Sequence, residues 1–160
     1  MSAWRHLRAI GLLPLMATLI APLLILESSG PVDVDRGLVP GLVLIGLGLL
    51  LVVWTIGLFA RVGRGTLAPW DPTTRIVVRG PYRHLRNPMI GGVTLILVGE
   101  AALFASLPLL AWAAAFFAVN AIYMPLVEEP GLERRFGGEY ERYRANVPRW
   151  LPRPRPWDPG

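Results

Sequence analysis

MIGGVTLILVGEAALFASLPLLAWAAAFFAVNAIYMPLV, residues 89–127, is the stretch that decides the fold. It is almost wholly apolar and is interrupted only by Glu100, Asn120 and prolines. As a single α-helix it would be roughly 57 Å long, nearly twice the ~30 Å hydrocarbon core of a bilayer. It must therefore fold back on itself. The expected break is Ser106-Leu107-Pro108, because proline removes a backbone donor and clashes with the preceding helical turn.

The composition of the whole chain indicates an integral membrane protein. Of its 160 residues, 53% are hydrophobic and only 17% are charged, which is improbable for a soluble domain. The first apolar run could be a signal peptide, since Arg5 and Arg8 precede it, but Pro14, Pro22 and the lack of a small-x-small cleavage site favour an uncleaved span. The sequence predicts an all-α integral membrane protein with about four transmembrane helices in a single domain over residues 1–160, with spans at 9–26, 38–60, 89–107 and 109–127.

The distribution of arginine predicts the orientation. All sixteen basic residues are arginine, and they concentrate before the first span, in the loop 61–88 and in the C-terminal tail. The loop 27–37 instead carries three acids and one arginine. The positive-inside rule then puts both termini and the loop 61–88 in the cytoplasm, and the expected location is a prokaryotic inner membrane. The net charge of +5 reflects this orientation, so membrane lipids are expected as partners and nucleic acid is not.

Beyond Pro130 the pattern changes to that of a cytoplasmic amphipathic helix. Such a helix lies on the membrane surface or covers the end of the bundle. Its apolar positions recur at steps of three and four: Leu132, Phe136, Tyr140, Tyr143 and Val147. The chain has no cysteine and two histidines, which excludes thiolate metal sites and is too few for a histidine-rich one, so no metal site is expected.

Two motifs bracket the apolar hairpin. Gly80-Pro81-Tyr82-Arg83 and Arg86-Asn87-Pro88-Met89 precede it, and Glu128-Glu129-Pro130, Phe136-Gly137-Gly138-Glu139-Tyr140, Tyr143 and Val147-Pro148-Arg149 follow it. Over roughly residues 65–152 this two-part pattern resembles the isoprenylcysteine carboxyl methyltransferase and phospholipid methyltransferase superfamily. The resemblance implies a membrane methyltransferase that holds S-adenosylmethionine on the cytoplasmic side, under the C-terminal segment. A lipid or lipidated small molecule would enter from the bilayer as substrate.

Two positions depart from the motif of that superfamily, which is Arg-His-Pro-x-Tyr followed by a Glu-Glu pair after a helical hairpin. Asn87 stands where the motif has histidine, and Ile90 stands where it has tyrosine. The asparagine amide still donates and accepts hydrogen bonds, so a cofactor contact can survive the first change. Isoleucine has no polar group, so a hydroxyl contact would be absent or would come from one of the four tyrosines, Tyr82, Tyr123, Tyr140 or Tyr143.

The resemblance also implies a set of site residues. The cofactor carries an ammonium, a carboxylate, a ribose diol and a sulfonium, so its pocket needs acidic, basic and hydrogen-bonding groups together. The expected catalytic residues are Arg83, Arg86 and Glu128. The expected cofactor-binding residues are Tyr82, His84, Asn87, Pro88, Glu128, Glu129, Tyr140 and Tyr143. A tight hairpin would bring the two motifs within one interhelical distance, ~8–10 Å between axes.

The methyl acceptor and some residue roles stay open at this point. A carboxylate acceptor needs only an arginine to orient it, whereas a lipid amine needs a base such as Glu128 or Glu129. Arg83 and Arg86 could instead contact lipid phosphates, and Glu100 is expected to pair with Asn120 between the last two spans. A nicotinamide-dependent reductase-like enzyme and a non-catalytic four-span protein are the alternative functions.

Overall fold

A computed structural model describes residues 16–29, 37–63 and 76–159, and the regular structure within these ranges is helical, which confirms the all-α prediction. A short π-helix and α2 come first, α3 runs into a second π-helix, a 3-10 turn leads to α4, and α5 continues without a break into α6. The elements are η1 (Met16–Ile20), α2 (Ala21–Ser29), α3 (Leu38–Leu58), η2 (Phe59–Gly63), η3 (Gly80–Arg83), α4 (Pro88–Leu103), α5 (Leu107–Tyr123), η4 (Met124–Glu128), α6 (Glu129–Phe136) and α7 (Gly138–Asn146).

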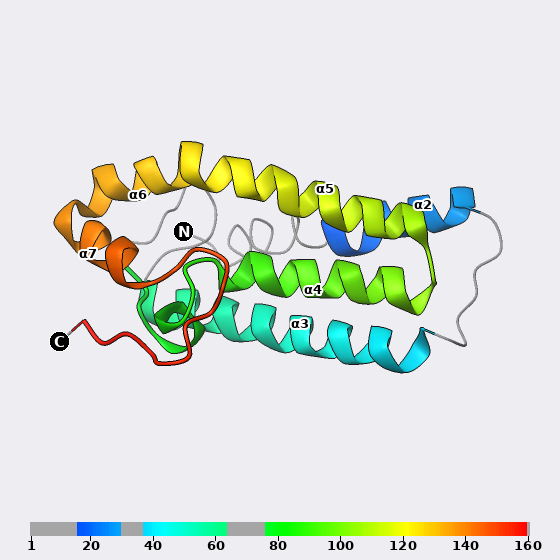
Figure 1. Cartoon of the computed structure of the whole chain (residues 1–160), viewed down its shortest axis with the longest axis horizontal. Coiled ribbons are helices and arrows are strands. Elements are labelled where there is room, and N and C mark those ends of the chain that lie inside the picture. Colours follow the sequence, from blue (N-terminus) through cyan, green and yellow to red (C-terminus); the bar gives the residue numbers. More distant parts are fainter. Residues whose placement is uncertain (1–15, 30–36, 64–75, 160) are drawn as a thin grey trace.

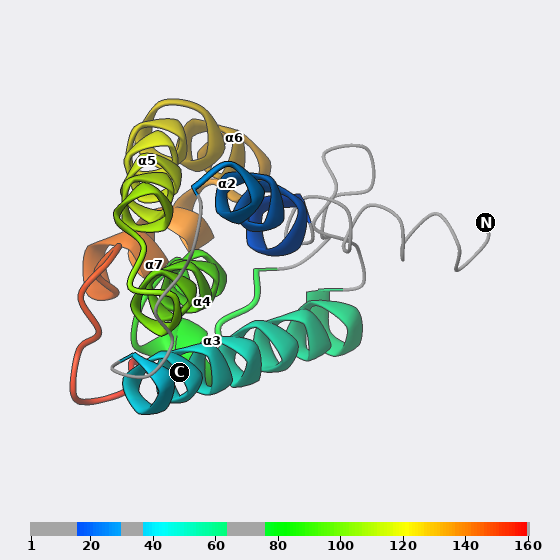
Figure 2. The same cartoon turned by 90° about the vertical axis from the view of Figure 1, so that its right-hand side faces the viewer.

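The helices form an elongated bundle in which α4 lies between α3 and α5, and α2 lies beside α5 (Figures 1 and 2). The buried centre of the bundle is made by Val52 of α3, three residues of α4 and Ala113 of α5. The three from α4 are Val93, Ile96 and Leu97. The start of α4, α6, α7 and the C-terminal tail gather at one end of the bundle (Figure 1).

Two helices are long and apolar enough to cross a membrane, Leu38–Val62 and Leu107–Phe136. Two shorter apolar helices are Met16–Ser29 and Pro88–Leu103. Part of the expected first span, residues 9–15, lies outside the described residues. The third expected span is shorter than predicted, because α4 ends at Leu103 and not at residue 107. In the second long helix, the apolar stretch from Leu107 to Val127 is ~31 Å long, about the thickness of a hydrocarbon core, and Glu128 and Glu129 follow it directly.

The contact between α3 and α4 is a backbone contact through four glycines, called the glycine contact below: Gly41, Gly48, Gly92 and Gly99. A Cβ added to Gly48 would lie 2.6 Å from the carbonyl oxygen of Gly92, and one added to Gly41 would lie 2.8 Å from that of Gly99. Gly41 and Gly48 thus allow the close approach of α3 to α4, whereas Gly46 and Gly57 of the same helix have no described atom within 4 Å of an added Cβ.

The turn between α4 and α5 lies where the sequence predicts it. Ala105 adopts a positive φ of 44°, and the hydroxyl oxygen of Ser106 accepts a hydrogen bond from the Leu109 backbone N–H at 3.4 Å. The expected pairing of Glu100 with Asn120 is wrong, because Asn120 Nδ2 donates instead to the Phe116 carbonyl, 2.8 Å away in its own helix. Glu100 lies near the turn, whereas Asn120 lies near the far end of α5, so the two side chains sit at different depths.

The C-terminal region forms two helices, so the prediction of one continuous amphipathic helix is wrong. The helix breaks at Gly137, whose φ of 53° suits glycine, and α7 then turns back toward the bundle end (Figure 1). The apolar positions of the predicted stripe nevertheless gather in one cluster. Tyr140, Tyr143 and Val147 are buried there, with Ile76, Val78, Leu132, Phe136 and Trp157 packed around them. Residues 76–87 and 128–158 are called the cap below.

Candidate functional site

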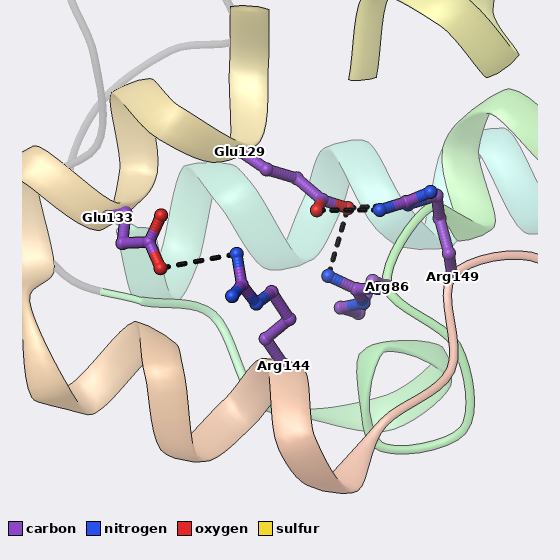
Figure 3. A network of polar contacts seen from close by, with 5 residues as sticks. All are labelled: Arg86, Glu129, Glu133, Arg144 and Arg149. Atoms are coloured by element: carbon purple, nitrogen blue, oxygen red, sulfur yellow. Dashed lines mark hydrogen bonds and ion pairs between the residues drawn. The ribbon is translucent and has the colours of Figure 1, made fainter. Parts of the chain in front are cut away.

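The centre of the cap is an ion triad of Arg86, Glu129 and Arg149 (Figure 3). Arg149 binds Glu129 in a bidentate manner, with Nε to Oε1 at 2.7 Å and Nη2 to Oε2 at 2.8 Å. Arg86 Nη1 lies 2.9 Å from the same Oε1. The Glu129 side chain is 6% exposed and that of Arg86 is 10% exposed. The triad therefore joins the start of α4, the start of α6 and the C-terminal tail through one buried carboxylate.

The two arginines determine the protonation state of Glu129. Burial acts to raise the pKa of its carboxyl, but the hydrogen bond from Arg149 and the charges of Arg86 and Arg149 outweigh burial and hold that pKa below its usual value. The hydrogen bond to Glu129 raises the pKa of Arg149. Glu129 is thus an anion shared by two cations, which makes it a poor proton acceptor.

Several buried donors of the cap have no acceptor among the described residues. These are Arg86 Nε, Asn87 Nδ2 and also Arg86 Nη1, which is close to Glu129 but is not aligned for a hydrogen bond. A buried donor without a partner costs about 1–3 kcal/mol, and more when it is charged. Such groups are rare in folded proteins and need an explanation.

The C-terminal tail is hydrogen-bonded to the loop before α4 along its length. The backbone N–H groups of Arg86, Arg153 and Trp157 donate to the carbonyl oxygens of Pro148, His84 and Arg83, at 2.9, 3.0 and 3.0 Å respectively. The loop enters this pairing through η3, which begins at Gly80 with a φ of 54°, a conformation that favours glycine. The tail also reaches α5, where Trp150 packs edge-on against Phe117 with ring centroids 5.0 Å apart.

The side chains of Arg83 and His84 bind the C-terminal tail. Arg83 Nε donates to the Trp157 carbonyl at 2.6 Å, and its Nη2 pairs with Asp158 at 2.9 Å. His84 Nδ1 lies 2.8 Å from the Arg153 carbonyl, and because a carbonyl only accepts, Nδ1 carries the proton. Both side chains hold the tail in place in this structure.

The tyrosines of the cap are buried and neutral. The Tyr143 hydroxyl donates to the Tyr82 carbonyl at 2.8 Å, and Tyr82 packs edge-on against Phe59, with ring centroids 5.4 Å apart. Burial raises the pKa of Tyr82 and Tyr143, and it also raises that of Tyr140, to which the nearby charge of Glu129 adds. These groups therefore serve as hydrogen-bond donors and packing surfaces and not as bases.

The structure brings most of the sequence-predicted site residues into the cap. Pro88 is buried as the first residue of α4, and Asn87 directly precedes it. Glu128 differs from its neighbour Glu129, because it is exposed and makes no ion pair with any described residue. Sequence reasoning missed Arg149 as a site residue. Its signal was its place in Val147-Pro148-Arg149, a segment of the two-part pattern to which the sequence assigns no role, and only the fold places it against Glu129.

The sequence pattern of the family described as phospholipid methyltransferase matches residues 37–139. That range covers well over half of the chain. The chain belongs to the phospholipid methyltransferase family. No curated protein and no solved structure shows significant similarity to it.

The matched range of this phospholipid methyltransferase family member contains α3, α4, α5, α6 and both acids of the Glu128-Glu129 pair. Family membership, together with the two long apolar helices, indicates a membrane methyltransferase. Arg149 and the tail lie beyond residue 139, so the family match includes two members of the ion triad and not the third.

Proposed function

We propose that the protein is an integral membrane enzyme that transfers a methyl group from S-adenosylmethionine to a lipid or lipid-like acceptor. The observation that carries this proposal is the ion triad, because it joins the two motifs that bracket the apolar hairpin into one buried polar site at the end of the bundle. Family membership supports methyl transfer, and the long apolar helices support an acceptor drawn from the bilayer.

The residues of the cap fit the cofactor. The unpaired donors of Arg86 and Asn87 suit an anionic or carbonyl group, and the free carboxylate of Glu128 suits an ammonium or a ribose hydroxyl. When bound, S-adenosylmethionine supplies a methyl group on a sulfonium, which a nucleophile can accept without a covalent enzyme intermediate. The tail is bound to the loop through Arg83 and His84, so the task that we propose for the protein is to position and desolvate the reactants.

The acceptor is either a carboxylate of the isoprenylcysteine type or a phospholipid amine. Arg83 and Arg86 are the residues that would orient a carboxylate. Glu128 is the candidate base for an amine, because Glu129 is held as an anion by two arginines. Tyr82, Tyr140 and Tyr143 contribute neutral donors or walls.

The proposed topology has four spans, with both termini and the cap in the cytoplasm, and with α6 and α7 at the membrane surface. Seven residues of α4 are buried, since it lies between α3 and α5, so a helix shorter than the hydrocarbon core is sheltered by its neighbours. A reporter fused after Trp157 should be active only in the cytoplasm, and an exported reporter would contradict this orientation.

The direct test is calorimetry of the purified protein in detergent with S-adenosylmethionine and, separately, with NADPH. We expect binding of S-adenosylmethionine and none of NADPH. The variant Glu128→Gln should bind S-adenosylmethionine about tenfold more weakly, equivalent to ~1.4 kcal/mol, while Glu139→Gln, which changes an exposed acid of α7, should bind normally. Binding of NADPH alone would favour a reductase, and binding of neither would favour a non-catalytic protein.

A further inference from the structure

Two consecutive residues at the start of α4 carry buried side-chain donors without an acceptor. Arg86 Nε and Asn87 Nδ2 make no hydrogen bond within the part of the chain that the structure describes, and the Arg86 side chain is nine-tenths buried. Buried polar groups in folded proteins are nearly always paired. Two adjacent unpaired donors therefore indicate an acceptor that does not belong to the described part of the chain.

The first turn of α4 points to the same kind of group. Asn87 is the N-cap residue, and an asparagine there ordinarily accepts a hydrogen bond from the N–H groups of the first turn. Its side chain makes no such bond here. The N-terminus of α4, a helix of 16 residues, thus has no side-chain cap and presents its partial positive charge, which favours an anion.

The net charge of the ion triad favours the binding of an anion. Both oxygens of Glu129 are engaged by Arg86 and Arg149, so this acid is not free to bind a cation. Two arginines against one carboxylate leave the triad with one net positive charge. An ammonium placed beside Arg86 would be repelled, whereas an oxyanion would complete the pairing.

We propose that Arg86, Asn87 and the first turn of α4 form a binding site for a single carboxylate. Arg86 Nε and Asn87 Nδ2 each offer one hydrogen bond, which matches the two oxygens of that group. The source of the carboxylate rests on the proposed function: it belongs either to S-adenosylmethionine or to the lipid acceptor. In both cases the site binds the anionic part of a reactant, and Glu129 serves as a positioning residue for Arg86.

The test uses Asn87→Asp, which places a negative charge beside Arg86. This change gives Arg86 a partner and should keep or raise the thermal stability, but it should repel a bound anion. Asn146→Asp is the matched control, because Asn146 is an exposed residue of α7 whose amide bonds only to its own helix. The probes for calorimetry are S-adenosylmethionine, its decarboxylated analogue, N-acetyl-S-farnesylcysteine and the methyl ester of that compound.

We expect Asn87→Asp to lower the affinity for one of the two carboxylate-bearing probes about tenfold or more. The affinity for the matching probe that lacks a carboxylate should not change. A loss for S-adenosylmethionine identifies the cofactor as the source, and a loss for the farnesylcysteine identifies the acceptor. Asn87→Ala, which removes the donor without adding charge, should act in the same direction with a smaller loss, and it replaces the aspartate variant if that one does not fold.

If the Asn87 variants bind S-adenosylmethionine and N-acetyl-S-farnesylcysteine as tightly as the wild type or more tightly, the proposed carboxylate site is wrong. The proposed function would still stand if the wild type binds S-adenosylmethionine. If the wild type binds only the farnesylcysteine, and the Asn87 variants weaken it, the site stands and the cofactor assignment fails. Absence of binding for all four probes would reject both.

Discussion

In the glycine contact, α3 and α4 meet backbone to backbone and no charged group takes part, whereas in the cap three charged side chains from distant parts of the chain meet at one carboxylate. The glycine contact depends on the absence of side chains at four positions. The cap depends on the presence of side chains at residues 86, 129 and 149. The first arrangement is fixed by shape alone, while the second responds to protonation, to charge and to bound anions.

This difference indicates how the protein divides its tasks. The glycine contact gives a rigid frame for the bundle, and in the proposed topology van der Waals packing between close backbones is the main force that holds such a contact in a bilayer. The cap then assembles a polar site on the end of that frame. A change in the cap should alter binding and local stability, and a change in the glycine contact should alter the whole bundle.

The largest effect is expected for Glu129→Gln. This change leaves Arg86 and Arg149 without their shared anion, and breaking a buried ion pair from one side typically lowers stability by ~3–5 kcal/mol. The matched control is Glu133→Gln, which breaks the more exposed pair with Arg144 at 3.2 Å and should lower stability by ~1 kcal/mol or less (Figure 3). Chemical denaturation in detergent measures both. Similar losses in the two variants would mean that the triad is not the centre of the cap.

The next largest loss of stability is expected for a substitution in the glycine contact between α3 and α4. Gly48→Ala adds a Cβ 2.6 Å from the Gly92 carbonyl oxygen, and since backbone cannot move aside easily, we expect a loss of ~1–3 kcal/mol or more. Gly46→Ala, two residues away on the same helix, meets no atom of the described residues within 4 Å and should gain a few tenths of a kcal/mol to ~1 kcal/mol from helix propensity. The same denaturation measurement applies, and a neutral Gly48→Ala would show that α3 and α4 can separate without penalty.

These two sites also show what could be predicted from the sequence. The apolar run 89–127, its break at Ser106-Leu107-Pro108 and the meeting of the two motifs followed from helix length and proline chemistry, which are local properties. Which glycines face α4 depends on the rotation of α3, and this rotation is set by contacts with a helix that is distant in the sequence. Arg149 escaped prediction for the same reason, because its role requires the tail to fold back onto α6.

A third, smaller effect is a different response of the two regions to acid. Because the pKa of Glu129 is lowered in the folded protein, its stabilising effect is fully present above the ordinary value of 4.5 and is lost as the pH falls from there through the folded-state pKa. Hydrogen-exchange protection of the Trp157 amide, which bonds to the Arg83 carbonyl, should therefore decrease on acidification. Protection of Ile96 at the glycine contact should not, and in Glu129→Gln the acid-dependent part should be missing. Equal losses at both amides would indicate global unfolding instead.

The smallest effect is expected for Asn120, where the sequence suggested a stabilising pair with Glu100. The Asn120 amide bonds to the Phe116 carbonyl of its own helix, so it joins no two elements of the bundle through that bond. That carbonyl already takes part in the helix, and Asn120→Leu would place an apolar side chain on a half-buried position of an apolar span. We expect a change in stability within about 0.5 kcal/mol, less than the ~0.6 kcal/mol average of an interhelical hydrogen bond in a membrane. A loss of 1 kcal/mol or more would show that Asn120 holds a second element, and the depth difference between Glu100 and Asn120 would then have to be reconsidered.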